Sequence, residues 1–115
     1  MSKMDFKEYQ KLAVITKMPC DKKTDMIICA LGLTGESGEI ADVIKKHLTG
    51  YDSKGNTTVL EIDKIKKELG DIMWYVASLC ECLDLDMGEI AQMNIDKLRK
   101  RHGDKYTGYG NRDND

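Results

Sequence analysis

The chain has 115 residues and a formal net charge of −2, with 18 Lys and Arg against 20 Asp and Glu. This length corresponds to one domain and excludes a multidomain enzyme, and the balanced charge excludes nucleic-acid binding through a general excess of positive charge. Only 1 Pro and 1 Phe occur among many good helix formers, which indicates an all-α fold. The N-terminus is polar and no apolar run reaches about 18 residues, so we expect a cytoplasmic protein that does not contact membranes.

The first helix is predicted over roughly residues 4–17. Ser2 followed three residues later by Asp5 resembles a capping box at its start. Apolar side chains then recur at helical spacing until Pro19 interrupts the pattern, so the helix should end shortly before that residue.

A second, longer helix is predicted over residues 25–48, after a cap at Asp21 or Thr24. Its apolar side chains recur at spacings near 3.6 residues, which is typical of a helix with one buried face. Glycine in a helix interior costs about 1 kcal/mol relative to Ala, so close approach of another helix or of a ligand must compensate here. The glycines concerned are Gly32, Gly35 and Gly38.

Residues 49–58 are rich in turn formers and are predicted to form a surface loop. Thr58 followed by Glu61 repeats the capping-box pattern and should begin a third helix. This third helix has the most regular apolar spacing in the chain, at Ile62, Ile65, Leu69, Met73 or Ile72, Val76, Cys80 and Leu83.

A fourth helix should begin at Asp86, with Glu89 three residues later, and should end at Gly103 as its C-cap. The folded domain is therefore predicted to span residues 1–103. Residues 104–115 form a polar tail that cannot bury a core and is expected to fray. The expected architecture is a bundle of four to five helices around two long central ones.

Two acidic pairs lie within the second and third predicted helices: Glu36 with Glu39, and Glu68 with Asp71. Side chains three residues apart in a helix project from the same side, about one turn from each other. Both pairs border the apolar stripes that should pack together, so the carboxylates are expected to converge between the two helices. For either pair alone, an ordinary solvated acidic surface is the simpler interpretation.

Converging carboxylates repel one another unless protons or cations compensate for their charge. A bound metal is the economical solution, and a site built only from oxygen ligands selects Mg²⁺ or Mn²⁺ rather than zinc. The cysteines, which include the neighbours Cys80 and Cys82, do not have the spacing of a zinc site and are expected to be reduced thiols.

The segment LTGESGEIAD at residues 33–42, with Lys45 and Lys46 after it, and the segment ELGDIMWY at residues 68–75 resemble the MazG-like all-α nucleoside triphosphate pyrophosphohydrolases. The signature of that family is E-x-x-E followed one helix later by E-x-x-D, and the resemblance covers about residues 6–102. It implies Mg²⁺-dependent hydrolysis of a (deoxy)nucleoside triphosphate to the nucleoside monophosphate and pyrophosphate, with Mn²⁺ as a substitute ion. In that reaction a metal-activated water attacks the α-phosphorus.

The same resemblance implies roles for particular residues. One of the two glutamates of the first pair would orient or deprotonate the attacking water. The metal ligands and catalytic acids would be Glu36, Glu39, Glu68 and Asp71. Substrate contacts are implied for Tyr75, Asn94, Lys97 and Arg101. The family and the small core together imply a homodimer or homotetramer whose active sites borrow residues from the neighbour.

Several residues near these motifs have simpler interpretations. Phe6, Tyr9 and Trp74 are candidates for stacking on the base, but Trp74 in the centre of its helix is better explained as core. Lys45 and Lys46 are better explained as a solvated last turn that the helix dipole favours than as phosphate ligands.

Two other classes of protein also place acids on helices. A di-iron carboxylate bundle needs Glu-x-x-His pairs, whereas Ile44 and Arg99 stand three residues before His47 and His102, so that class is excluded. A non-catalytic helical dimerisation module, with the acids on its solvated surface, remains open and predicts no dependence on Mg²⁺.

Overall fold

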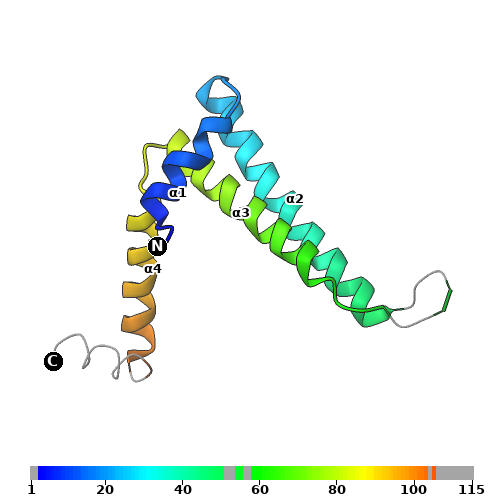
Figure 1. Cartoon of the computed structure of the whole chain (residues 1–115). Coiled ribbons are helices and arrows are strands. Elements are labelled where there is room, and N and C mark those ends of the chain that lie inside the picture. The colour runs from blue at the N-terminus through cyan, green and yellow to red at the C-terminus, as the bar shows by residue number, and fades with distance from the viewer. Residues whose placement is uncertain (1–2, 51–53, 56–57, 104, 106–115) are drawn as a thin grey trace.

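The computed structural model describes residues 3–50, 54–55, 58–103 and 105. All the regular structure in these residues is helical: α1 (Phe6–Ala13), the short 3₁₀ helix η1 (Val14–Thr16), α2 (Lys22–Thr49), α3 (Ile62–Cys82) and α4 (Met87–Arg101) (Figure 1). The predicted all-α fold is confirmed, and the two long helices are α2 and α3. Part of the predicted loop at residues 49–58 and all of the predicted tail except Lys105 lie outside the described residues.

An aspartate carboxylate caps the start of α1, α2 and α4. In each case the side chain precedes the helix and accepts a hydrogen bond from a backbone N–H in the first turn, which satisfies one of the free donors there. The caps predicted for the second and fourth helices are confirmed, whereas α1 begins at Asp5 and not at the expected Ser2, which lies outside the described residues. The bonds are Glu8 N to Asp5 at 2.8 Å, Thr24 N to Asp21 at 2.9 Å and Glu89 N to Asp86 at 2.9 Å.

The capping box predicted at Thr58 is wrong. The residue before α3 is Glu61, and its side chain makes no capping bond. The Thr58 hydroxyl instead donates to the Lys46 carbonyl at 2.7 Å, and its backbone N–H donates to the Gly50 carbonyl at 3.2 Å. Thr58 therefore closes the C-terminal end of α2. A Cβ at Gly50 would lie 2.7 Å from the same Lys46 carbonyl, which explains the glycine at this position.

Two predicted helix ends also differ from the structure. The first helix is α-helical only to Ala13 and finishes as a 3₁₀ turn, because the backbone becomes extended at Lys17, before Pro19. The fourth helix ends at Arg101, and its C-cap is His102, whose N–H donates to the Leu98 carbonyl at 2.8 Å, and not Gly103.

Helices α2 and α3 form a long antiparallel hairpin, and α1 packs across its open end (Figure 1). The small core lies there, where Ala77 and Cys80 of α3 meet Met87 of α4 beneath residues of α1. Trp74 is half-buried, and its Nε1–H donates to the Ala13 carbonyl at 2.9 Å.

Helix α4 diverges from the hairpin (Figure 1), and no Cα of α4 comes within 8 Å of a Cα of α2. The radius of gyration is 18.4 Å, whereas a compact chain of this length has about 13 Å.

None of the described helices combines the length and the apolar content needed to cross a membrane.

Candidate metal centre

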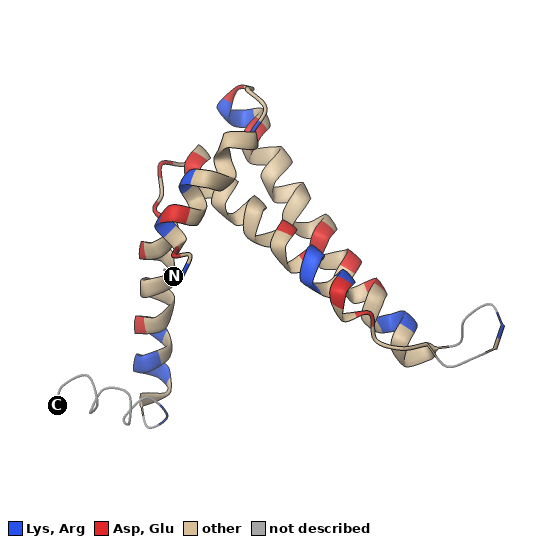
Figure 2. Ribbon diagram, in the orientation of Figure 1, with Lys and Arg blue, Asp and Glu red and all other residues tan. Residues whose placement is uncertain are grey.

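Three glutamates from the two long helices meet in the middle of the hairpin. Glu36 and Glu39 of α2 and Glu68 of α3 each contribute one carboxylate oxygen, and these oxygens lie within 4.8 Å of one another. Acidic side chains are concentrated along this part of α2 and α3 (Figure 2). The spacing of three residues places both α2 carboxylates on the side facing α3, as expected from the helical periodicity.

Asp71, the fourth predicted ligand, is exposed and lies outside this group of three among the described residues. It is nevertheless close enough to act on the group electrostatically. The pKa of Glu39 is raised mainly by the neighbouring Glu68 carboxyl, and the charge of Asp71 adds to this. The pKa of Glu68 is raised mainly by Glu36, with burial and then Asp71 adding smaller parts. Mutual repulsion therefore disfavours full ionisation of the cluster.

The carboxylate oxygens of the cluster are suitable ligands for a hard divalent cation. Glu36 Oε2 and Glu68 Oε2 are buried and receive no hydrogen bond from any described residue. A buried carboxylate oxygen without a donor carries the full cost of desolvation. Since every atom available in the cluster is a carboxylate oxygen, the residues present suit Mg²⁺ or Mn²⁺.

Two lysines of the hairpin interact with its acidic side chains. Lys46 is exposed and forms an ion pair with Asp42 at 2.9 Å, one turn before it, which agrees with a solvated last turn of α2. Lys64 is a cation whose charge reaches the cluster, where it opposes the rise in the pKa of Glu39. The sequence analysis missed Lys64, although its position four residues before Glu68 was a usable signal.

Tyr75 lies on α3, one turn beyond Asp71. Its ring covers Gly32 so closely that a Cβ there would overlap the ring carbons. The Tyr75 and Trp74 rings also pack in a T-shaped arrangement, with centroids 5.2 Å apart and planes at 87°. Close approach by Tyr75 therefore explains Gly32, whereas Cβ atoms at Gly35 and Gly38 would meet nothing described within 4 Å.

A pocket of about 220 Å³ adjoins Tyr75 at the open end of the hairpin. One wall is the ion pair of Lys17 with Asp25 at 2.6 Å, and Lys17 also donates to the Ser78 carbonyl at 2.9 Å. The hydrogen bond from Lys17 lowers the pKa of Asp25. The pocket is lined by Thr16, Lys17, Met18, Cys20, Asp25, Ile28, Trp74, Tyr75 and Ser78. Of the other aromatic candidates, Phe6 is exposed and Tyr9 packs against the core.

The predicted substrate residues of α4 are not near the glutamates of the same chain. Asn94, Lys97 and Arg101 are exposed, and their side chains make no hydrogen bond or ion pair with another described residue. Their helix diverges from α2, so within one chain the structure brings together Glu36, Glu39 and Glu68, with the charge of Asp71 acting on them. The roles of Asn94, Lys97 and Arg101 stay predictions.

Known proteins resemble the chain over the region that carries the cluster. A family model described as the MazG nucleotide pyrophosphohydrolase domain matches residues 27–105. The gene 37 protein of Mycobacterium phage L5 is 42% identical over 82 residues, which cover 71% of this chain and 70% of that protein. No solved structure matches the chain significantly.

Proposed function

Because this chain belongs to the MazG nucleotide pyrophosphohydrolase family, we propose that it hydrolyses a (deoxy)nucleoside triphosphate to the nucleoside monophosphate and pyrophosphate. The observation that carries the proposal is the cluster of Glu36, Glu39 and Glu68, which contains two buried oxygens without a donor. This arrangement has no structural benefit for the hairpin, since it places like charges between two packed helices. It is suited to holding a cation that in turn binds a triphosphate.

The role we assign to each residue of the cluster follows from how deeply its side chain is buried. Glu36 and Glu68 are half-buried and would hold Mg²⁺ through their unsatisfied oxygens, with Asp71 at the rim. Bound there, Mg²⁺ supplies Lewis-acid chemistry: it lowers the pKa of water and neutralises charge on the leaving pyrophosphate. Glu39 is exposed, so it reaches the solvent from which the attacking water comes, and it would orient that water towards the α-phosphorus.

The pocket beside Tyr75 is the place we propose for the base. Tyr75 follows Glu68 by seven positions on α3, which is about 10 Å along a helix. A nucleotide whose phosphates lie at the acids would therefore extend its base towards the pocket. The lining includes the rings of Trp74 and Tyr75 for stacking, and the Lys17 and Asp25 pair offers a donor and an acceptor to the edge of a base.

We further propose that the chain works as a homodimer or homotetramer and that its folded domain ends near residue 103, before a separate tail. The exposed apolar side chains favour assembly, since a monomer rarely leaves so many large ones in water. They include Leu31, Ile44, Leu48, Ile62, Leu69 and Met93. The same surface also favours the second candidate, a non-catalytic dimerisation module.

The decisive experiment incubates the protein with Mg²⁺ and a panel of canonical and damaged ribo- and deoxynucleoside triphosphates, and identifies the products. Pyrophosphate and a nucleoside monophosphate support the proposal, whereas inorganic phosphate and a diphosphate would show a different reaction. Thermal unfolding with Mg²⁺ and a non-hydrolysable nucleotide separates the second candidate, because a specific ligand raises the melting temperature by mass action. A dimerisation module would show no such shift.

A further inference from the structure

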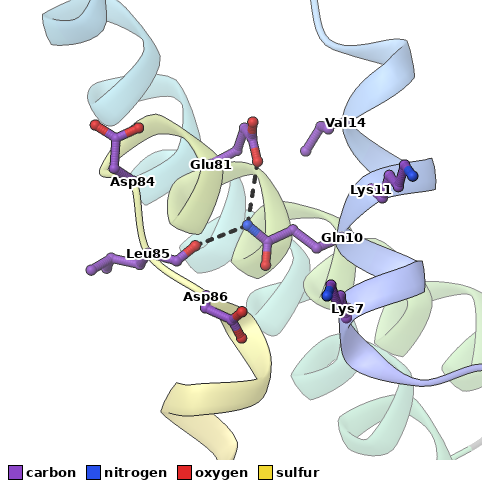
Figure 3. A pocket seen from close by; sticks show the side chains of 8 residues that line it. All are labelled: Lys7, Gln10, Lys11, Val14, Glu81, Asp84, Leu85 and Asp86. Atoms are coloured by element: carbon purple, nitrogen blue, oxygen red, sulfur yellow. Dashed lines mark hydrogen bonds between the residues drawn. The ribbon is translucent and has the colours of Figure 1, made fainter.

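A groove lies between α1 and the turn that follows α3 (Figure 3). Its volume is about 390 Å³, which is in the lower part of the range of small-molecule sites. Glu81 in its wall follows Glu68 by 13 positions on α3, which is about 20 Å along a helix. The groove is therefore separate from the acidic cluster of the hairpin.

One wall of the groove is basic. Lys7 and Lys11 lie one turn apart on α1, so their side chains leave the helix on the same side. Both are exposed, and neither side chain makes a hydrogen bond or an ion pair with another described residue. Two ammonium groups arranged in this way can bind one anionic group.

The opposite wall is acidic. It contains Glu81 from the last turn of α3, and Asp84 and Asp86 from the turn after it. In the part of the chain that the structure describes, no lysine or arginine forms an ion pair with any of these three. The two walls therefore carry opposite charges that are not paired with each other.

Asp84 occupies a position that suits glycine better. Its φ is 56°, in the left-handed region that side chains with a Cβ disfavour. The Leu85 N–H donates to the Cys80 carbonyl at 2.7 Å, and the Asp84 N–H donates to the Glu81 carbonyl at 3.3 Å. This pattern ends many helices, and the residue at the position of Asp84 is then usually Gly. The backbone of the turn does not require a carboxylate here, which favours a role for Asp84 in the groove.

Gln10 crosses the groove and connects its two walls (Figure 3). Its Nε2 donates to the Leu85 carbonyl at 2.9 Å and to the Glu81 carboxylate at 3.3 Å. Its Oε1 accepts from the N–H of Met87, the first residue of α4, at 2.8 Å. Val14 adds apolar surface beside Leu85. Because these bonds hold α1 against the turn, the groove is formed before any ligand binds.

We propose that this groove binds a free basic amino acid. The described lining carries two positive and three negative charges, so a complementary ligand has one anionic and two cationic groups. Free arginine and lysine have this set: a carboxylate, an α-ammonium group and a charged side chain. The carboxylate then lies at Lys7 and Lys11, the cationic groups lie at the acidic wall, and the methylene chain packs on Val14 and Leu85. This site does not depend on the proposed hydrolysis of nucleotides.

Isothermal titration calorimetry of the full chain with L-arginine tests the site. We expect saturable binding with a dissociation constant below about 1 mM. Two analogues are matched controls: agmatine lacks the carboxylate, and citrulline has an uncharged side chain of the same shape. Each loses charged hydrogen bonds, so each should bind at least about 10-fold more weakly than arginine. Equal binding of all three, or no saturable binding of arginine, overturns the proposal.

Variants of both walls test the location. Lys7→Ala combined with Lys11→Ala, and separately Asp84→Gly, should each weaken arginine binding at least about 10-fold. Asp84→Gly should at the same time raise the melting temperature of the protein without arginine, because glycine suits the left-handed backbone. This variant therefore separates a loss of binding from a loss of folding.

Lys66→Ala is the matched control, since it removes an exposed lysine of α3 that does not line the groove. It should bind arginine within about two-fold of the wild type. If Lys66→Ala weakens binding as much as the variants of the walls do, the effect is one of general charge and the site is wrong. Normal binding by the variants of the walls overturns it equally.

A last comparison distinguishes a free amino acid from a peptide segment of a partner protein. N-acetyl-L-argininamide keeps the guanidinium group but has no free carboxylate or α-ammonium group, as in a peptide. We expect it to bind at least about 10-fold more weakly than arginine, because only its side chain is charged. Binding as tight as that of arginine would assign the groove to a protein partner and overturn the proposal.

Discussion

Replacing Gly32 with Ala tests the packing of the Tyr75 ring against α2. A Cβ at Gly32 would overlap Cε1 and Cζ of the Tyr75 ring and would lie 2.5 Å from Cδ1. Ordinary carbon contacts are about 3.5–4.0 Å, so the ring must retreat by at least about 1 Å. Trp74 restricts that movement, because it meets the Tyr75 ring edge-on and its own Nε1–H is bonded to the Ala13 carbonyl.

The expected loss follows from two opposing effects. Overpacking of this kind costs about 1–3 kcal/mol, whereas Ala in place of Gly in a helix interior gains about 1 kcal/mol. The net effect of Gly32→Ala is therefore a destabilisation of up to about 2 kcal/mol. Gly70→Ala in α3 is the matched control, because no described atom lies within 4 Å of its Cβ. The control should gain about 1 kcal/mol, so the difference between the two variants isolates the cost of packing.

Urea unfolding of the metal-free protein, followed by circular dichroism, measures both free energies. Combining Gly32→Ala with Tyr75→Ala closes a double-mutant cycle. Once the ring is gone, Gly32→Ala should stabilise the protein by about 1 kcal/mol, as the control does. If Gly32→Ala and Gly70→Ala stabilise the otherwise unchanged protein equally, the ring does not lie on Gly32 and the account of Tyr75 is refuted.

Three further predictions concern the charged groups. Glu68→Gln should raise the melting temperature of the metal-free protein at pH 7 and abolish the shift caused by Mg²⁺. The folded-state pKa of Glu68 is raised mainly by Glu36. Its ionised form therefore destabilises the folded protein above that pKa, and this destabilisation disappears as pH falls. Thermal unfolding in chelator between pH 4 and 8 checks this, and a variant less stable than the wild type would contradict it. Asp25→Asn should cost about 1.5–3 kcal/mol at pH 7, because a charge-assisted bond from the largely buried Lys17 is lost. The hydrogen bond from Lys17 lowers the folded-state pKa of Asp25, so this stability is present above the unfolded pKa and lost as pH falls through the folded one; an unchanged acid limb in the variant would show that the pair contributes nothing. Asp71→Asn should abolish turnover with full helicity by circular dichroism, and an active variant would remove Asp71 from the site.

The meeting of the acids was predictable because it depends on local spacing. In both long helices the carboxylates are three residues apart and border the apolar stripe, so the pairing of the stripes brings Glu36 and Glu68 together. The caps at Asp21 and Asp86 were predictable for the same reason, since the side chain and its N–H partner are only three residues apart. Asp71 shows the limit of such reasoning. Its spacing from Glu68 matches that of Glu39 from Glu36, yet its side chain is exposed and lies outside the group of three glutamates.

The features that could not be predicted depend on contacts between distant parts of the chain. Thr58 and Glu61 have the spacing of a capping box, but the Thr58 hydroxyl is bonded to Lys46, 12 residues earlier. Gln10 sets the direction of α4 by bonding to Leu85 and Met87, 75 and 77 residues away. Neither pairing has a local signal, so the sequence gives no indication that α4 leaves the hairpin and takes Lys97 with it.

Side-chain hydrogen bonds stabilise the two ends of the hairpin, whereas buried carboxylate oxygens in its middle have no hydrogen-bond donor. At the open end, Lys17 bonds to Asp25 of α2 and to the Ser78 carbonyl of α3, and the Cys29 thiol donates to the Ser78 hydroxyl at 3.2 Å. At the closed end, Thr58 holds the last turn of α2. Between these ties the buried oxygens of the glutamates have no donor. Separating the helices to relieve the repulsion between the carboxylates would break the hydrogen bonds at the open end. The fold thus sets the distances between the carboxylates before any cation binds. Binding a cation therefore requires little further ordering of these side chains.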